Sequence, residues 1–153
     1  MKGLAKFIAS FFYLGYTPIA PGTFGALGAV LFLYILDRLQ LYSVLTLFVL
    51  VVIFYTAGVW AVNMLRADWG EDPAGVVVDE AVGLWISVLF LPITHLNILM
   101  AFILFRIFDI VKPLGIRKME RFRSGHGVML DDVLAGIYAN AVLQLISLLF
   151  YQV

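Results

Sequence analysis

Five carboxylates stand at the ends of long apolar stretches in this 153-residue chain, where ionised side chains are costly to keep. An acidic side chain near the middle of a bilayer costs about 2.5–3.5 kcal/mol on insertion scales, and less near its surface. Acids cannot neutralise one another, whereas carboxylate oxygens are the ligands that Mg²⁺ prefers. The sequence therefore predicts a Mg²⁺ site whose ligands and catalytic residues are Asp79, Glu80, Asp109, Asp131 and Asp132.

Two basic residues accompany one of these acids. Arg106, Asp109 and Lys112 recur every three residues, so on a helix they share one face. One interpretation is a ladder of ion pairs at a membrane surface. The other gives Asp109 to the metal and both cations to a phosphate group, because the arginine fork matches phosphate oxygens and lysine adds a point charge. The second interpretation makes Arg106 and Lys112 candidate phosphate-binding residues.

A segment rich in glycine and proline, residues 17–28, offers a further polar site. Its glycines permit close approach of the backbone, and Thr23 can cap a helix that begins there. Free N–H groups at the start of a helix bind anions. We therefore expect Gly22 and Thr23 to help bind phosphate, with a capped helix and a small-residue packing face as the alternative.

The acidic pairs also have a structural interpretation. Carboxylates at a helix start, such as Asp79 and Glu80, complement the positive end of the helix dipole. Either Asp131 or Asp132 can be the N-cap of the last helix. Capping accounts for one acid of each pair and leaves the other unexplained. Further along that helix, Asn140 and Gln144 continue a polar face at intervals of four, for which packing against another helix is the favoured role.

The composition indicates a membrane protein with a single domain, residues 1–153. Hydrophobic residues make up 63% of the chain and the mean hydropathy is +1.04, against about 45–50% apolar residues in soluble domains. The net charge of zero argues against a nucleic-acid partner. The absence of cysteine excludes disulfides, thiolate metal sites and a cysteine nucleophile. No cleavable signal peptide is expected, because prolines follow the first apolar stretch.

The apolar stretches predict an all-α, multi-pass bundle of membrane helices. The longest, residues 41–65, would extend about 38 Å, enough to cross a hydrocarbon core of about 30 Å. In chain order we expect a short interfacial helix at 3–16, crossings at 24–36 and 41–65, an acidic loop at 66–80, a helical stretch at 81–105, a basic segment at 106–132 and a final crossing at 133–153.

Pro92 lies near the middle of the stretch 81–105, and a proline removes a backbone donor and blocks the helix. Either this stretch crosses once with a kink, or two short helices turn back as a hairpin. Basic segments prefer the cytoplasm, and both the N-terminus and residues 106–132 are basic. The hairpin is therefore favoured, and it brings all five carboxylates to the cytoplasmic side. Lys118, Arg121 and Arg123 would then face lipid headgroups or solvent.

Two other phosphatase patterns do not fit. Ser124-Gly125-His126 matches the central motif of acid phosphatases related to the type 2 phosphatidic acid phosphatases, but the Arg-Pro motif of that family is absent. The Asp-x-Asp pattern of haloacid dehalogenases is also missing, and His95 is expected at a turn far from the acids. With no established nucleophile motif, direct attack by water is favoured over an aspartyl-phosphate intermediate.

Four motifs together resemble the phosphatidylglycerophosphatase A family of bacterial lipid phosphatases. They are residues 21–25 (PGTFG), 79–83 (DEAVG), 105–113 (FRIFDIVKP) and 127–136 (GVMLDDVLAG). The resemblance runs from about residue 10 to the last helix. It implies Mg²⁺-dependent hydrolysis of phosphatidylglycerol phosphate to phosphatidylglycerol and inorganic phosphate, in the bacterial cell membrane. The chain departs from the family at residues 124–127 (SGHG), where the family often has a glycine pair.

A small membrane transporter, or a scaffold subunit with a structural cation site, is the alternative function. A transporter would place its acids near the middle of the membrane, whereas these acids cluster at one edge beside Arg106 and Lys112. A scaffold predicts that the substitutions Asp109→Asn and Asp131→Asn leave lipid composition unchanged.

Overall fold

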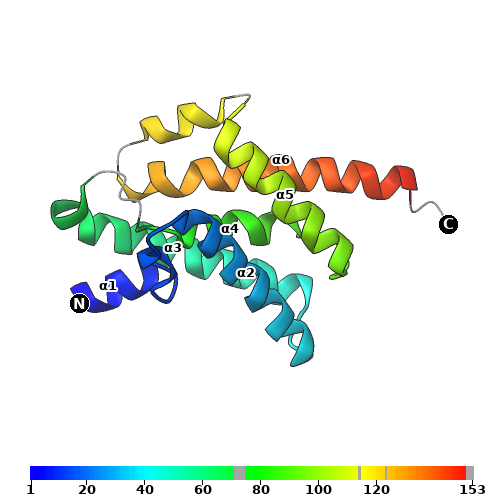
Figure 1. Cartoon of the computed structure of the whole chain (residues 1–153), viewed down its shortest axis with the longest axis horizontal. Coiled ribbons are helices and arrows are strands. Elements are labelled where there is room, and N and C mark those ends of the chain that lie inside the picture. Colours follow the sequence, from blue (N-terminus) through cyan, green and yellow to red (C-terminus); the bar gives the residue numbers. More distant parts are fainter. Residues whose placement is uncertain (71–74, 114, 123, 151–153) are drawn as a thin grey trace.

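The computed structural model describes residues 1–70, 75–113, 115–122 and 124–150, without the side chains of 120 and 150. Over these residues its regular elements are all helices, as predicted (Figure 1). Residues 71–74, Arg123 and the last three residues of the predicted final crossing lie outside the described residues. The elements in chain order are α1 (Lys2–Ala9), η1 (Leu14–Tyr16), α2 (Pro21–Arg38), α3 (Val44–Trp69), α4 (Val78–Ser87), α5 (His95–Val111), η2 (Ile116–Arg121) and α6 (Gly125–Phe150), where η marks a 3₁₀ helix.

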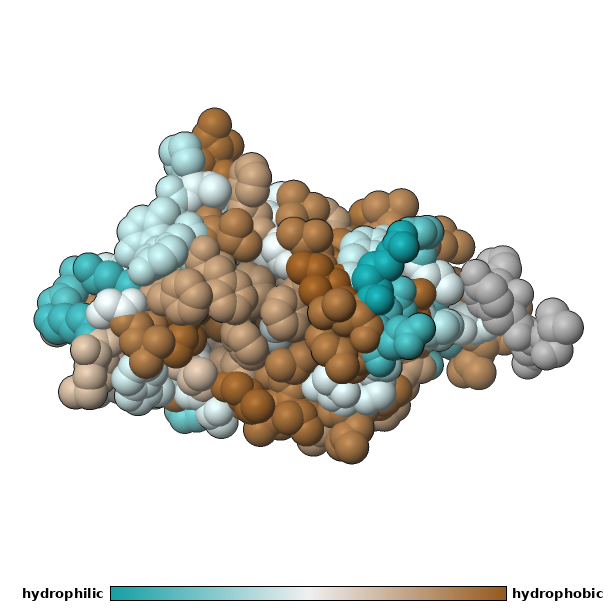
Figure 2. Space-filling view, turned by 90° about the horizontal axis from the view of Figure 1, so that it is seen from below, coloured by the Kyte–Doolittle hydropathy of each residue, from teal (hydrophilic) through white to brown (hydrophobic). Residues whose placement is uncertain are grey.

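Two of the described helices, α3 and α6, are long and apolar enough to cross a membrane. The 26 residues of α3 extend about 39 Å, against a hydrocarbon core of about 30 Å. Many of their apolar side chains face outward, with Leu45 71% exposed and Leu148 64% exposed. A core helix of a soluble protein would bury such residues. Figure 2 shows the result on one face, a broad hydrophobic surface between polar patches, which suits contact with lipid.

The short helix α4 lies at the centre of the molecule, with α2, α3, α5 and α6 packed around it (Figure 1). Val82, Leu84 and Trp85 are fully buried. The Trp85 indole N–H donates to the backbone oxygen of Ala29 in α2, at 3.2 Å, and its ring packs edge-on against Phe54 of α3. A buried tryptophan removes a large apolar area from solvent and still satisfies its one donor. Helix α4 is therefore the common packing partner of α2, α3, α5 and α6.

Helices α4 and α6 touch backbone to backbone. A Cβ added to Gly136 of α6 would overlap the carbonyl oxygen of Gly83, and one added to Gly83 would lie 2.7 Å from the carbonyl oxygen of Asp132. Small residues allow this approach between apolar helices. The contact places Asp132 directly beside the start of α4.

The predicted break at Pro92 is present, because α4 ends at Ser87 and α5 begins only at His95. The Thr94 side chain caps the new helix by accepting from the backbone N–H of Asn97, at 3.1 Å. The chain then runs back, since Arg106 near the end of α5 lies 4.0 Å from Glu80 at the start of α4. A single kinked helix over 81–105 is therefore wrong, and two helices that reverse direction are present.

The prediction of one helix over residues 3–16 is also wrong. Helix α1 ends at Ala9, and Phe11, Phe12 and Tyr13 follow with positive φ angles of 43°, 61° and 69°. Left-handed backbone is unfavourable for such residues. Burial offsets that cost, because Phe11 is 1% exposed and its ring packs against Trp85 at 5.7 Å between centroids.

Both predicted N-caps are wrong. Helix α6 begins at Gly125 rather than near 133, so Asp131 and Asp132 lie inside its second turn. Its start is fixed by the Gly125 N–H, which donates to Asn63 Oδ1 of α3 at 2.7 Å. Helix α2 begins at Pro21 without a side-chain cap, and the amides of Thr23 and Phe24 donate to the Ala20 carbonyl.

The polar residues inside α6 stabilise the broken end of α4, in line with the packing role expected for them. Asn140 Nδ2 donates to the carbonyls of Ser87, at 3.0 Å, and Leu89, at 2.8 Å, and Gln144 Nε2 donates to Leu89 at 3.3 Å. The last carbonyls of a helix have no partner within it. These amides therefore allow α4 to end inside the apolar bundle.

Replacing Asn140 with leucine tests this role. Asn140→Leu keeps the side-chain size but leaves the Ser87 carbonyl without its donor, which costs about 1–3 kcal/mol when that group is buried. We expect a lower midpoint of thermal unfolding in detergent, followed by circular dichroism. Gln144→Leu removes one longer hydrogen bond and should lower the midpoint less; equal midpoints for wild type and Asn140→Leu would contradict the role.

Candidate metal and phosphate site

Four helices bring their polar ends together on one side of the molecule. The start of α2 meets the start of α4 at Gly22 and Glu80, and the end of α5 reaches both α4 and α6 through Arg106 and Lys112. Asp79 and Asp131 therefore lie on the same side, although 52 residues separate them in sequence. The five predicted carboxylates all belong to this group of helix ends.

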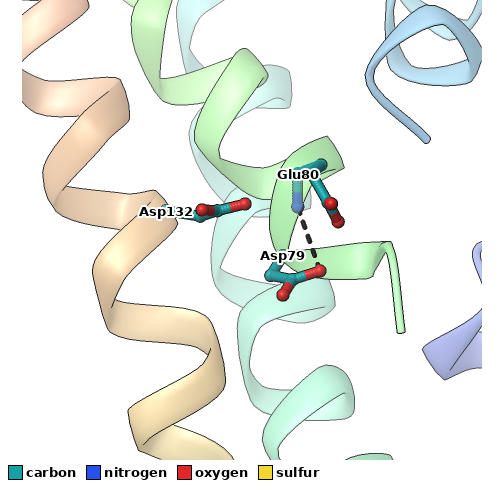
Figure 3. Close-up of side chains that lie close together, drawn as sticks. All are labelled: Asp79, Glu80 and Asp132. Atoms are coloured by element: carbon teal, nitrogen blue, oxygen red, sulfur yellow. Dashed lines mark hydrogen bonds between the residues drawn. The ribbon is translucent and has the colours of Figure 1, made fainter. Parts of the chain in front are cut away.

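Three of the carboxylates converge on one point. One oxygen each from Asp79, Glu80 and Asp132 lie within 4.8 Å of one another, close enough to hold a single metal ion. Figure 3 shows Asp132 extending from α6 toward the first turn of α4, which carries the other two acids. The Glu80 backbone N–H donates to Asp79 Oδ1 at 3.1 Å, which orients that carboxylate. We call these three residues the acidic triad.

Burial makes the triad electrostatically unfavourable by itself. Asp79 is 9% exposed and Asp132 is 3% exposed. Burial, together with the charge of Glu80, raises the pKa of Asp79 well above its ordinary value. Burial also raises the pKa of Glu80. Carboxyl groups that lie this close together and are this well shielded from water can all be ionised only when positive charge is nearby.

The other two acids each have a basic partner. Arg106 Nη1 donates to Asp109 Oδ2 at 2.5 Å, and Lys112 Nζ donates to Asp131 Oδ2 at 2.7 Å. The predicted ladder of ion pairs along α5 is thus only partly observed. Arg106 pairs with Asp109 of its own helix, whereas Lys112 pairs with Asp131 of α6. Arg106 borders the acidic triad, with its Nη1 4.0 Å from Glu80 Oε1, and Lys112 is held at Asp131, next to Asp132 in the sequence.

Several buried polar atoms at this site have no hydrogen-bond partner among the described residues. They are Glu80 Oε2, Asp131 Oδ1 and Arg106 Nε. A buried charged atom without a partner is costly, so such atoms point to a missing ligand. The donor set consists of carboxylate oxygens, which suits Mg²⁺, Mn²⁺ or Ca²⁺ rather than a thiol-seeking metal. The residues present fit a divalent cation, and the Arg106 guanidinium beside it fits an anion.

The glycine-rich segment reaches this site through its backbone. A Cβ added to Gly22 would overlap Glu80 Oε1 and would lie 3.3 Å from Arg106 Nη1. Only glycine lets Glu80 approach the start of α2 this closely. The Thr23 backbone N–H already donates to the Ala20 carbonyl. Of the two backbone amides expected to bind phosphate, the Gly22 amide is therefore the remaining candidate. The Thr23 side chain lies in the same turn and is partly exposed.

Two contacts that position the site were not predicted from the sequence. The Val77 N–H donates to the Ala9 carbonyl at 2.9 Å, which holds the segment before Asp79 against the end of α1. Asn63 holds the start of α6. No local pattern identifies such residues, because each acts on a distant segment. The two histidines lie in other contacts, His126 with Tyr55 and His95 with Tyr34, each at 2.8 Å.

Comparison with known proteins identifies one family and several similar proteins. The model of the family described as phosphatidylglycerophosphatase A matches residues 7–147. A Bacteroides thetaiotaomicron protein named "Putative phosphatidylinositol-3-phosphatase" is 52% identical over 141 residues, covering 89% of each chain. Proteins named phosphatidylglycerophosphatase A are 36% identical in Escherichia coli, covering 87% of this chain and 77% of the relative, and 40% identical in Haemophilus influenzae, covering 80% and 76%. No solved structure matches the chain significantly.

Removing one acid of the triad tests the metal site without any assay of activity. Asp132→Asn keeps the size of the side chain and removes one ligand charge, so we expect the affinity for Mn²⁺ or Mg²⁺ to fall by about 10–100-fold. Titration calorimetry on the purified protein measures this directly. Asp68→Asn is the matched control, since Asp68 pairs with Lys2 at 2.8 Å on the surface; equal affinities in all three proteins would rule out the site.

Proposed function

This chain belongs to the phosphatidylglycerophosphatase A family, and from this premise we propose that it hydrolyses phosphatidylglycerol phosphate to phosphatidylglycerol and inorganic phosphate. This reaction is that of a phosphoric monoester hydrolase. The names of the Escherichia coli and Haemophilus influenzae relatives indicate this activity. The observation that supports it best in this chain is the meeting of a buried acidic triad with Arg106 and Lys112. Negative charge for a cation and positive charge for a phosphate lie at the same helix ends.

In this proposal Asp79, Glu80 and Asp132 hold Mg²⁺, and Asp109 and Asp131 complete the acidic surroundings. Held by these residues, Mg²⁺ would supply positive charge next to the oxygens of the phosphate group. Arg106 binds the terminal phosphate through the guanidinium atoms that Asp109 does not engage, Nε among them. Lys112, positioned by Asp131, adds a second positive charge. The Gly22 amide at the start of α2 donates to a phosphate oxygen.

Water is the proposed nucleophile. Asp109 and Asp131 already accept from Arg106 and Lys112, so their oxygens are less available for attack on phosphorus. Asp131 Oδ1 has no hydrogen-bond partner among the described residues, and we assign to it the role of accepting a proton from the attacking water. A phosphate adduct on any aspartate, found by rapid quench and mass spectrometry, would refute this step.

The membrane arrangement follows from the same helix ends. We propose a single-domain, multi-pass protein in which α2, α3 and α6 cross the bilayer of the bacterial cell membrane and α4 and α5 enter and leave on one side. Lys2 lies 2.8 Å from Asp68 at the end of α3, so the basic N-terminus is on the side of the acids. The basic residues Arg117, Lys118 and Arg121 of η2 follow the end of α5 on this side. Positive residues prefer the cytoplasm, which would place the site at the inner surface.

A second candidate substrate comes from the relative that is 52% identical and is named for a phosphatidylinositol phosphate. Both lipids carry a phosphate monoester on a headgroup joined to diacylglycerol phosphate. The acidic triad and its cations would act on either. The difference would lie in the space available to a glycerol or to an inositol ring.

Phosphate release by the purified protein decides between these substrates. With Mg²⁺ present we expect rapid release from phosphatidylglycerol phosphate, at least about tenfold slower release from phosphatidylinositol 3-phosphate and phosphatidic acid, and none after chelation. Preference for the inositol lipid would transfer the assignment to the second candidate. Release from none of the three lipids would refute the phosphatase function.

Gly22 provides a test of the geometry. The Cβ of Gly22→Ala would push the Glu80 carboxylate away from its position, and a displacement of about 1 Å at a reacting centre can cost about 100-fold in rate. We expect this loss in kcat with an unchanged circular dichroism spectrum. Gly3→Ala in α1 is the control, because nothing lies within 4 Å of the added atom. Equal kcat values for the two variants would show that the approach of α2 to Glu80 is not needed.

A further inference from the structure

The segment before α4, residues 75–77, leads into the helical turn that carries two acids of the triad. It lies against residues 9–16, from the end of α1 to the end of η1, which we call the N-terminal turn. The Val77 N–H donates to the Ala9 carbonyl at 2.9 Å. Helix α1 itself packs along α3 (Figure 1). The N-terminal turn therefore connects one of the long helices with the start of α4.

Gly15 lies closer to this segment than any side chain would allow. A Cβ added to Gly15 would overlap the carbonyl oxygen of Gly75 and would lie 2.9 Å from its carbonyl carbon. Both atoms belong to the backbone, so they cannot rotate away as the end of a flexible side chain can. The path of the chain at Gly75 therefore depends on the absence of a side chain at residue 15.

The N-terminal turn is fixed by its own hydrogen bonds. The Ser10 hydroxyl donates to the Lys6 carbonyl at 2.6 Å and accepts from the Tyr13 N–H at 3.1 Å. The Gly15 N–H donates to the Ser10 carbonyl at 2.9 Å. Ser10 is fully buried, and a buried polar group whose hydrogen bonds are made resists displacement. Gly15 therefore presents a rigid surface to Gly75.

Helix α2 holds the same segment through a second close contact. A Cβ added to Gly25 would lie 2.7 Å from Val77 Cβ and 3.0 Å from the Val77 carbonyl oxygen. Val77 is fully buried. Its amide is thus bonded to the end of α1, while its side chain lies against α2. A segment held in this way cannot move at Gly75 without moving the first turn of α4.

We propose that Gly15 is a positioning residue, which acts through Gly75 and Val77 on the metal-binding carboxylate of Asp79. The inference rests on the proposed function, in which Asp79 is a ligand of the cation, and it gives the N-terminal turn a part in forming the site. Mg²⁺ requires a nearly ideal octahedral arrangement of oxygens, so a displaced ligand weakens its binding. A side chain at residue 15 would displace Asp79 by pushing on the backbone at Gly75.

Asp79 is the acid of the triad that depends most on this segment. It follows Val77 by two residues, and its Oδ1 accepts from the Glu80 N–H within the same turn. Glu80 has a separate contact with α2 at Gly22, and Asp132 comes from α6. A shift of the segment therefore changes the position of Asp79 relative to Asp132.

Gly15→Ala tests the proposal by metal binding alone. The probe is Mn²⁺, and its affinity for the purified protein is measured from the electron paramagnetic resonance signal of the free ion. We expect the affinity to fall about tenfold, since lost support of a metal ligand typically costs about 10–100-fold. Gly75→Ala is the matched control, because its Cβ would lie 3.7 Å from the Gly15 carbonyl oxygen, an ordinary contact. It should bind like wild type; equal affinities for Gly15→Ala and wild type would overturn the proposal.

Gly28→Ala separates positioning from a general disturbance of the N-terminal turn. Its Cβ would overlap Leu14 Cδ1, the end of a flexible side chain in that turn. We expect a lower midpoint of thermal unfolding with unchanged Mn²⁺ affinity, and a loss of affinity equal to that of Gly15→Ala would contradict the proposal. If Gly15→Ala does not fold, Ser10→Ala replaces it, because it removes the hydroxyl that fixes the turn. Unchanged affinity in Ser10→Ala would then decide against the positioning role.

Combined substitutions show on which ligand Gly15 acts. Added to Asp79→Asn, Gly15→Ala should lower the Mn²⁺ affinity by less than about twofold more, whereas added to Asp132→Asn it should have its full effect. Full effects in both backgrounds would refute the route through Asp79. Phosphate release is measured separately. A wild-type protein that binds Mn²⁺ and shows these differences, but releases no phosphate from phosphatidylglycerol phosphate, would refute the proposed reaction and leave the positioning role intact.

Discussion

The backbone contact between α4 and α6 is the constraint on which the rest of the site depends. Because glycines face each other at residues 83 and 136, no side chain separates the two helices. Asp132 is thereby brought beside Asp79 and Glu80 in a buried space. Around this triad, two further acids and two cations leave negative charge in excess. The fold thus creates a buried cluster of carboxylates that could hold a metal ion.

Much of this arrangement could be predicted from the sequence, since it follows from local physics. An acid at the end of an apolar stretch lies near a membrane edge, and Pro92 has to interrupt the helix around it. Together these two facts bring Asp79 and Asp131 to one side, as the structure shows. The all-helical class followed from apolar stretches of sufficient length in the same way.

Other features depend on tertiary contacts that no local pattern contains. The start of α6 was placed too late because its cap is Asn63, a side chain from another helix. The turn at Phe11, Phe12 and Tyr13 opposes local backbone preference, and burial of the Phe11 ring against Trp85 stabilises it. Spacing alone paired Lys112 with Asp109, whereas the structure pairs it with Asp131, 19 residues away. Arg106 remains with Asp109, as spacing predicted.

The hydrogen bonds from Asn140 to the end of α4 have a consequence for the length of α6. Asp132 lies at the first turn of α4 and Asn140 at its last carbonyls. The step of eight positions from Asp132 to Asn140 is about 12 Å, the same as the step from Asp79 to Ser87 along α4. A single insertion in this interval would rotate one of the two side chains by about 100° away from α4. The spacing between Asp132 and Asn140 in α6 must therefore stay fixed. Within the family we expect substitutions inside this interval, and insertions or deletions only outside it.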